Sequence, residues 1–273
     1  MSDTLPPQNL FSLTPTHNPN RWYMPVTSAG SVGPADRQFM FGGVGLASAI
    51  TAMELTCGRK TVWATAQYLS YARPGETLDL DVIVPVSGKY NTQARVIGHI
   101  ADREIITVNA ALGSRPSDVS AQWAIMPDVP RPLECEEMIH WRSDGDNLHD
   151  HIESRLVKGR YGPDRVNAGL SEDGHVLMWC RMKDGLPINS GAVAIMADFV
   201  PSAIGNAIGR NAGGNSLDNT IRFREVVETE WVLCDIKIHS VHNGFSHGRM
   251  HLFAEDGTLM ASASQSVILR IHD

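Results

Sequence analysis

Strand-like segments near the end of each half of the chain align with one another at a fixed offset in residue number. Arg95 and Asp102 in the first half fall on Arg249 and Asp256 in the second half (249 − 95 = 256 − 102 = 154). An offset that stays constant over two segments is typical of an internal duplication. The chain is therefore expected to fold as two copies of one unit, and any architecture proposed for one half has to fit the other.

Each half also places one buried helix before its strands. The helix candidates are residues 39–58 and 188–205, and both are apolar on nearly every side, as expected of a helix surrounded by other elements. Strand candidates with β-type composition and alternation follow each helix. They are TVWATAQYLSYA, ETLDLDVIVPVS, YNTQARVIGHI and EIITVNAALG in the first half, and NSLDNTIRF, EWVLCDIKIHSV, SHGRMHLFA and TLMASASQSVILRI in the second half.

A helix followed by antiparallel strands, present twice, predicts an α+β fold in which each sheet wraps around its own helix. Pairing the two sheets edge to edge gives one continuous sheet and removes two exposed edges, which is the double hot-dog architecture. Composition then divides the chain, because Pro-rich and polar stretches are typical of arms and linkers. We predict an extended N-terminal arm over residues 1–34, a first unit over 35–118, a linker over 119–145 and a second unit over 146–273.

Composition also excludes several classes of function. A net charge of −7 does not favour binding to nucleic acid or to anionic membranes. The sequence has no uninterrupted apolar run near the roughly 20 residues of a membrane helix, and its N-terminus does not resemble a secretory signal. The cysteines are far apart, without a CxxC pair, as in a reduced cytoplasmic protein without a zinc site. We therefore expect a cytoplasmic protein with neither nucleic-acid nor membrane partners.

Two polar residues interrupt surfaces that should be apolar. Asp198 lies in the second helix candidate, where an unpaired charge would be expensive to bury. In the last strand, Gln265 lies on the face of the apolar residues, since side chains alternate between faces. That face should meet the helix that carries Asp198, and buried polar groups are normally hydrogen-bonded. We therefore expect Gln265 to contact Asp198, although a structural carboxylate paired with an arginine and a core amide would fit the same pattern. Ser216, at the start of a strand, is a third candidate.

These segments resemble the acyl-CoA thioesterase II family of double hot-dog enzymes over about residues 36–113 and 188–273. The stretches that carry the resemblance are, in order, FMFGGVGLASAI, QYLSYARPGE, ADF, SLDNTIRF and ASASQSVILR. The resemblance implies that Asp198 in ADF, Ser216 in SLD and Gln265 in ASASQS are catalytic. One departure is that AQYLSYARP stands in place of an aromatic-rich SxHxYFLRP-like stretch, which leaves the acyl-chain preference open.

The resemblance implies an acyl-CoA thioester hydrolase of fatty acid and lipid metabolism, which releases a carboxylic acid and coenzyme A. Asp198 would hold or deprotonate the attacking water, and Gln265 and Ser216 would orient it. No cofactor is expected, since CoA is part of the substrate. Backbone N–H groups at the start of the first helix are suited to bind the carbonyl oxygen of the thioester. The candidates for this role are Gly42, Gly43 and Val44.

Other interpretations remain open at this stage. A non-catalytic acyl-CoA-binding module, or a dehydratase or transferase that processes acyl-CoA or acyl-ACP thioesters, would use the same fold. The first unit should lack a site, because Ala111 stands in register with Gln265 (265 − 154 = 111). A metal site among the histidines of residues 239–251 is not favoured, because no acidic co-ligand recurs there. We expect a homo-oligomer, a dimer or higher, with acyl-CoA as its small-molecule partner.

Overall fold

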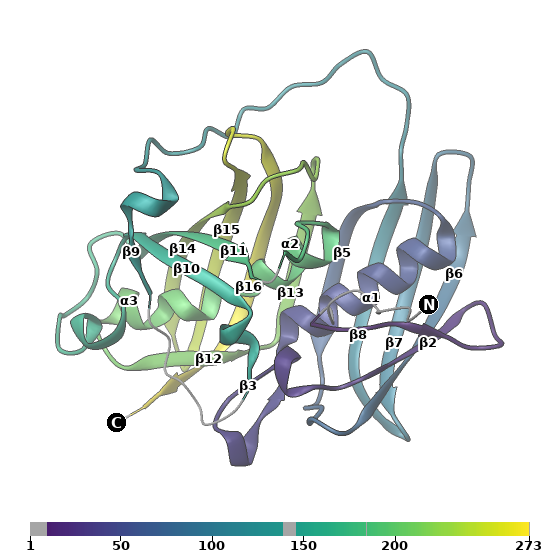
Figure 1. Cartoon of the computed structure of the whole chain (residues 1–273), viewed down its shortest axis with the longest axis horizontal. Coiled ribbons are helices and arrows are strands. Elements are labelled where there is room, and N and C mark those ends of the chain that lie inside the picture. Colours follow the sequence, from purple (N-terminus) through teal and green to yellow (C-terminus); the bar gives the residue numbers. More distant parts are fainter. Residues whose placement is uncertain (1–9, 139–145, 184, 273) are drawn as a thin grey trace, which may run out of the picture.

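The computed structural model describes residues 10–138, 146–183 and 185–272. The chain folds into two units that lie side by side, each a curved antiparallel sheet around a central helix (Figure 1). One sheet runs through both units in the strand order β1-β2-β6-β7-β8-β5-β13-β16-β15-β14-β11-β10-β9, and β12 pairs with β16 outside this path. The predicted double hot-dog fold is confirmed.

In the first unit, α1 lies against the concave face of the sheet and is buried along most of its length. It ends at Gly58, whose left-handed backbone (φ 62°) lets its N–H donate to the Glu54 carbonyl. The main elements of this unit are α1 (Gly42–Cys57), β5 (Thr61–Tyr68), β6 (Thr77–Ser87), β7 (Asn91–Ile100) and β8 (Arg103–Gly113). The smaller ones are β1 (Thr14–Pro15), β2 (Arg21–Pro25), η1 (Ser28–Gly30), β3 (Ser31–Val32), η2 (Ala35–Arg37) and β4 (Phe39–Met40).

The second unit repeats this arrangement, with a helical segment that is broken into pieces. Its strands are β9 (Glu136–Glu137), β10 (Ile152–Lys158), β11 (His175–Met182), β12 (Ala212–Ser216), β13 (Asp218–Phe223), β14 (Val232–His242), β15 (Phe245–Ala254) and β16 (Leu259–Ile271). Its helices are η3 (Pro132–Glu134), η4 (Leu148–Asp150), η5 (Gly162–Arg165), α2 (Ser190–Met196), η6 (Val200–Ala203) and α3 (Ile204–Ile208). The strands β7 and β15 have the predicted offset at both ends (245 − 91 = 254 − 100 = 154), which confirms the duplication.

Part of the predicted N-terminal arm belongs to the large sheet, through β1 and β2, while β3 pairs with β4 in a separate two-stranded sheet. β2 pairs with β6 from Arg21 to Pro25, and it begins 154 residues before its counterpart β11 (175 − 21 = 154). The side chains of Leu10, Met24 and Val26 are buried in the core. Polar, turn-forming residues outnumber apolar ones here, so composition suggests an arm, but the sheet buries the few apolar residues that are present. Residues 1–9 of the arm lie outside the described part of the chain.

The predicted linker crosses between the units as a long loop, at the top of Figure 1, and then joins the second unit. The Trp179 indole N–H donates to the Pro130 carbonyl oxygen at 3.0 Å. Further on, β9 adds a short strand to the sheet, with Glu137 opposite Arg155. The end of the linker is therefore packed on the second unit, and residues 139–145 lie outside the described residues.

The two units are joined by the antiparallel pairing of β5 with β13. The Thr65 and Thr220 hydroxyls meet across this junction at 2.7 Å. Above the sheet, α1 and α2 cross so closely that a Cβ atom on Gly43 would lie 2.7 Å from the Ile195 carbonyl oxygen. Glycine is therefore required at this crossing, and the two units form one continuous body.

The prediction of an unbroken helix through residues 188–205 is wrong. α2 ends at Met196, and the chain tightens into a turn in which the Asp198 N–H donates to the Ile195 carbonyl at 3.2 Å. Pro201 explains the break, because proline has no N–H for the carbonyl four residues earlier and its ring clashes there. That carbonyl belongs to Ala197, and it accepts from the Asn219 side chain at 3.3 Å instead. Asp198 therefore lies at a helix break and not within a helix.

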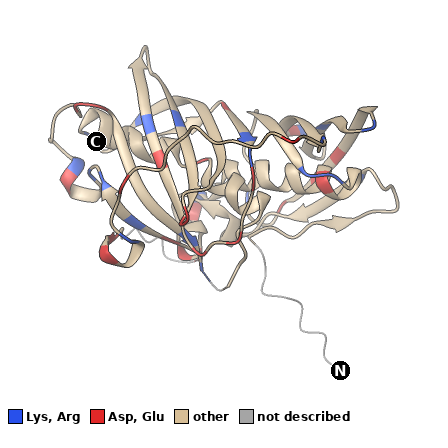
Figure 2. Cartoon of the chain, turned by 90° about the horizontal axis from the view of Figure 1, so that it is seen from above, with Lys and Arg blue, Asp and Glu red and all other residues tan. Residues whose placement is uncertain are grey.

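One apolar segment of the core and the distribution of charged residues bear on whether the protein binds membranes or polyanions. The segment Ser190–Ile208 is long and apolar enough, with a mean hydropathy of 1.4, to pass as a membrane span, but 72% of it is buried inside the protein. Core segments of folded proteins pass the same test, and here α2, η6 and α3 pack against α1 and the strands of the second unit. Lys and Arg are interspersed with Asp and Glu along the described chain (Figure 2).

Replacing Leu10 by alanine tests whether the N-terminal residues belong to the core. Leu10 is 3% exposed, so Leu10→Ala should lower the free energy of unfolding by about 2–5 kcal/mol. The matched control is Leu133→Ala, where the side chain is 71% exposed and the change should stay within about 0.5 kcal/mol. Denaturant unfolding measures both variants. Equal stability of the two variants would show that residue 10 is not part of the folded core.

Candidate active site

The structure brings the three predicted catalytic residues together around a buried carboxylate. Asp198 is 2% exposed, and its Oδ1 accepts hydrogen bonds from the Ser216 hydroxyl at 3.3 Å and from the Gln265 amide. The Gln265 amide N–H also lies 3.2 Å from the Ser216 oxygen. These contacts join the break after α2 to β12 and β16. Their catalytic roles remain predictions at this point.

A fourth residue, Asn219, completes the set, and the sequence analysis missed it. Its side-chain amide lies 3.5 Å from Asp198 Oδ1 and is fully buried. Asn219 shares strand parity with Ile221, which is also fully buried. An amide on that apolar face is the same signal that identified Gln265, and it would have found Asn219.

A local irregularity lets Ser216 and Asn219 face the same side of the sheet. In a regular strand, residues three apart point to opposite faces. Here β12 and β13 form two parts of one strand that is interrupted at Leu217, whose N–H donates to the Ser266 carbonyl at 2.8 Å. The Ser266 N–H in turn donates to the Asp218 carboxylate at 2.8 Å, which fixes the interruption. A break of this kind re-aims side chains next to functional sites.

The first unit supplies the start of α1 to this site. The Gly43 N–H lies beside the Asp198 carboxylate and lowers its pKa, and a Cβ atom on Gly42 would lie 2.7 Å from Asp198 Oδ2. The N–H of Val44 donates to the Phe41 carbonyl at 3.0 Å. Of the three predicted carbonyl-oxygen donors, Val44 thus already has an acceptor, and Gly43 faces the Asp198 carboxylate. Gly42 is the first residue of the helix, so its N–H has no acceptor within α1.

The surroundings of Asp198 shift its acidity in two opposing directions. Burial raises the pKa of the carboxyl from 3.8 to about 7, because the charged form loses its hydration. The hydrogen bonds from Gln265, Gly43, Ser216 and Asn219 lower the pKa and limit this rise. The group can therefore exchange a proton near neutral pH, as a general base should.

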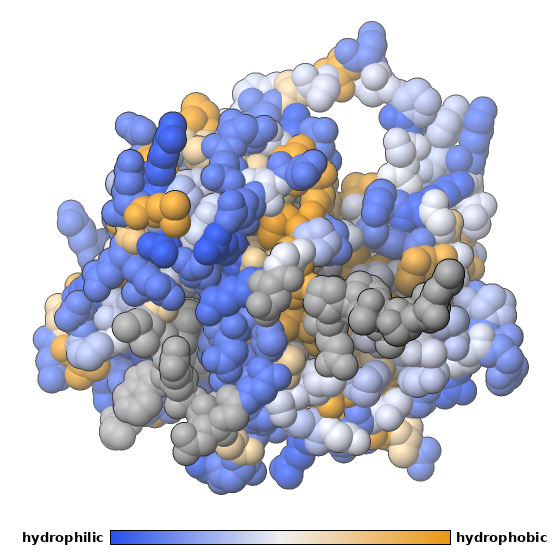
Figure 3. Space-filling model, viewed as in Figure 1, coloured by the Kyte–Doolittle hydropathy of each residue, from blue (hydrophilic) through white to orange (hydrophobic). Residues whose placement is uncertain are grey.

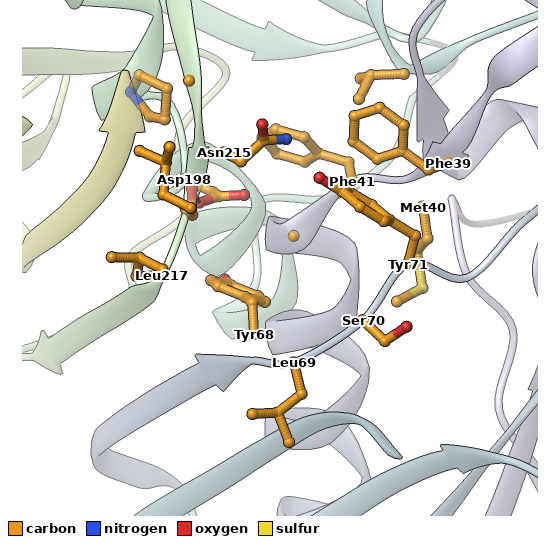
Figure 4. A pocket seen from close by; sticks show the side chains of 16 residues that line it. Phe39, Met40, Phe41, Tyr68, Leu69, Ser70, Tyr71, Asp198, Asn215 and Leu217 are labelled. Atoms are coloured by element: carbon orange, nitrogen blue, oxygen red, sulfur yellow. Dashed lines mark hydrogen bonds between the residues drawn. The ribbon is translucent and has the colours of Figure 1, made fainter. Parts of the chain in front are cut away.

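A pocket of about 340 Å³ opens beside Asp198, between the two units. Figure 4 shows Phe39, Met40 and Tyr71 of the first unit on one side of the pocket, and Asp198 and Leu217 of the second unit on the other. Figure 3 shows hydrophobic residues gathered between the two units on the face of Figure 1. An apolar pocket with a few convergent polar groups is the usual form of a small-molecule site.

The described residues contain no group of three or more His, Cys, Asp or Glu side chains placed to hold a metal ion. The histidines of residues 239–251 have other contacts, such as the His247 ring nitrogen 3.2 Å from the Ser266 hydroxyl. The contacts around Asp198 are amides, a hydroxyl and a backbone N–H, which suit proton transfer and water binding.

Comparison with known families identifies the chain. The family model described as the acyl-CoA thioesterase C-terminal domain matches residues 127–269, more than half of the chain. The chain therefore belongs to the acyl-CoA thioesterase family, as its motifs predict. No curated protein sequence matches it significantly.

Solved structures agree with this membership. A protein from Novosphingobium aromaticivorans, provisionally described as a thioesterase, is 33% identical, with a TM-score of 0.84 over 94% of this chain and 98% of its own. The acyl-CoA thioesterase II TesB2 from Mycobacterium marinum is 19% identical, with a TM-score of 0.73 over 96% and 97% of the two chains. A hot-dog protein of unknown function from Alicyclobacillus acidocaldarius, 16% identical with a TM-score of 0.81 over 96% and 97%, shares the fold.

The raised pKa of Asp198 predicts a pH-dependent cost in stability. The folded state binds the Asp198 proton more tightly than the unfolded state, so stability falls as pH rises from about 4 to about 7. Asp198→Asn removes this dependence. Between pH 5 and pH 8, the stability of the variant relative to wild type should increase by roughly 2–3 kcal/mol. Thermal melts at both pH values measure it, with the exposed Asp102→Asn as a control. A difference that does not change with pH would contradict a neutral-range pKa.

Proposed function

We propose that the protein hydrolyses an acyl-CoA thioester to a carboxylic acid and free CoA. The observation that carries the proposal is the buried Asp198 carboxylate, whose pKa of about 7 and hydrogen-bond donors suit a general base at the edge of an apolar pocket. Membership of the acyl-CoA thioesterase family supports the same reaction. The relative from Mycobacterium marinum is described as an acyl-CoA thioesterase II, which supports acyl-CoA as the substrate.

The geometry suggests how the residues divide the work. The three side-chain donors all reach Asp198 Oδ1, so Oδ2, which lies against Gly42 at the pocket, is the oxygen that binds water. Asp198 removes a proton as the water oxygen forms a bond to the thioester carbonyl carbon. The carbon–sulfur bond then breaks, and the departing thiolate takes the proton back from Asp198. Ser216 and Gln265 hold the Asp198 side chain in place, and their hydrogen bonds favour its ionised form at the start of each turnover.

The reaction as proposed uses no metal or separate cofactor, because a thioester is already activated towards water. It belongs to fatty acid and lipid metabolism, and the free cysteines among the described residues support a cytoplasmic location. The rival function is a module on the same fold that binds acyl-CoA without cleaving it. Continuous detection of free thiol, with a panel of acyl-CoA substrates that vary in length, branching and ring content, separates the two.

Asp198→Asn should lower kcat for thiol release by roughly 10²-fold or more, because the amide cannot accept the proton from water. The fold and the affinity for acyl-CoA should survive, since the side chain keeps its shape. Asp102→Asn is the control, because its carboxylate is exposed and carries no proposed role. A folded Asp198→Asn protein with wild-type turnover would rule out this mechanism.

The pH dependence of the wild-type rate offers an independent check. The ionised form of Asp198 is the base, so kcat/KM should rise with pH and level off above an apparent pKa of about 7. Initial rates with one acyl-CoA substrate between pH 5 and pH 9 measure the profile. A rate that is already maximal at pH 5 would mean that the essential base has an ordinary carboxyl pKa.

A further inference from the structure

Tyr68 lies in the candidate site without a role in the mechanism described so far. It is the last residue of β5 in the first unit, and its N–H donates to the Leu217 carbonyl of the second unit at 3.0 Å. Its ring packs against the start of α1, where two ring carbons lie 3.1 Å from the position of a Cβ atom on Gly42. Figure 4 shows Tyr68 close to Asp198, at the edge of the same pocket. The side chain is therefore held at the junction of the two units.

The hydroxyl of Tyr68 is a buried polar atom that makes no hydrogen bond to any of the described residues. The Asn219 amide lies beside it, but not in hydrogen-bond geometry. A buried hydroxyl without a partner costs about 1–3 kcal/mol, and a phenylalanine would fill the same space without that cost. A polar atom kept under such conditions indicates a ligand atom as its partner, and the pocket beside it is where a ligand would lie.

The Tyr68 hydroxyl is suited to act as a hydrogen-bond donor. Burial and the nearby Asp198 carboxylate raise the pKa of Tyr68 well above its ordinary value of 10. The phenol therefore keeps its proton at neutral pH, where Asp198 ionises. The atom that it binds therefore has to be a hydrogen-bond acceptor.

Gly42 provides a second donor in the same place. It lines the pocket, its N–H has no acceptor within α1, and Phe41 before it provides no side-chain cap. The N-terminus of α1 also carries the positive end of the helix dipole. The Tyr68 ring lies against Gly42 and both residues line the pocket, so two donors from different elements are neighbours at this edge of the pocket.

We propose that the Tyr68 hydroxyl and the Gly42 N–H together bind the carbonyl oxygen of the thioester. The proposal rests on the proposed function. When water adds to the carbonyl carbon, the π electrons move onto this oxygen, and the two donors stabilise the negative charge without transferring a proton. When the carbon–sulfur bond breaks, the electron pair returns to re-form the carbonyl, and the thiolate takes its proton from Asp198.

The matched pair Tyr68→Phe and Tyr23→Phe tests the proposal. Tyr68 lines the pocket, whereas Tyr23 is 37% exposed, lies on β2 near the outer edge of the sheet and does not line the pocket. Tyr68→Phe should lower kcat roughly 10²–10³-fold and leave KM nearly unchanged, because the hydrogen bond strengthens only as charge develops. Tyr23→Phe should stay within about twofold of wild type. The melting temperature of Tyr68→Phe should equal or exceed that of wild type, because an unpaired buried hydroxyl is removed.

A second substrate distinguishes the carbonyl oxygen from the leaving sulfur as the partner of Tyr68. A thioester of the same acid with a more acidic aryl thiol needs no proton on its leaving group, so an equal loss of kcat with both substrates supports the proposal. A loss that disappears with the aryl thioester overturns it, as does wild-type kcat in Tyr68→Phe or a loss accompanied by a lower melting temperature. If wild type itself releases no thiol from any acyl-CoA, the proposed function fails as well.

Discussion

The antiparallel pairing of β5 with β13 is the contact on which the rest of the structure depends. It converts two sheets into one, and it brings the end of β5 at Tyr68 against Leu217 of the other unit. The same pairing sets the crossing of α1 over α2 at Gly43, where only a glycine fits. Neither unit alone contains the candidate site, because the acid and its amides come from the second unit and the helix start comes from the first. The candidate site therefore forms only when the two units are paired.

The free-energy cost of burying Asp198 depends on which groups form hydrogen bonds with its carboxyl. A buried carboxylate with a structural role is usually paired with a cation, which holds its pKa low and its charge fixed. Asp198 is surrounded by neutral donors instead, and its pKa rises from 3.8 to about 7, which corresponds to a cost of roughly 4 kcal/mol at high pH. Neutral donors hold the group in position in either protonation state. A base that must gain and lose a proton in each turnover requires that property.

The sequence predicts the parts of this structure that depend on periodicity. The strands, the duplication and the contact of Gln265 with Asp198 all follow from alternation and offset. Asn219 carried the same signal and was missed, and the helix break at Pro201 was visible in the local sequence. The approach of Gly42 and Tyr68 to Asp198 could not be predicted in this way, because it depends on how two units pack and not on any pattern within one of them. The role of Ser216 came from resemblance, since an interruption at Leu217 overrides strand parity.

The duplicated fold carries one candidate site, and one reason is that a side chain caps the start of α2 but not the start of α1. At α2, the Asn189 side chain caps the helix by accepting from the Ala192 N–H at 3.0 Å. At α1, the cap residue Phe41 offers no side-chain acceptor, although a good cap is worth about 1 kcal/mol. The uncapped donors of α1 are available to Asp198 and to a ligand, whereas those of α2 are already satisfied. In the first unit, Ala110 occupies the place of Gln265, because it pairs with Ala94 on β7 as Gln265 pairs with Gly248 on β15 (248 − 94 = 154). The prediction that Ala111 matches Gln265 is wrong, because β8 and β16 differ by one residue in register. The capped helix and the missing amide together leave the first unit without a second site.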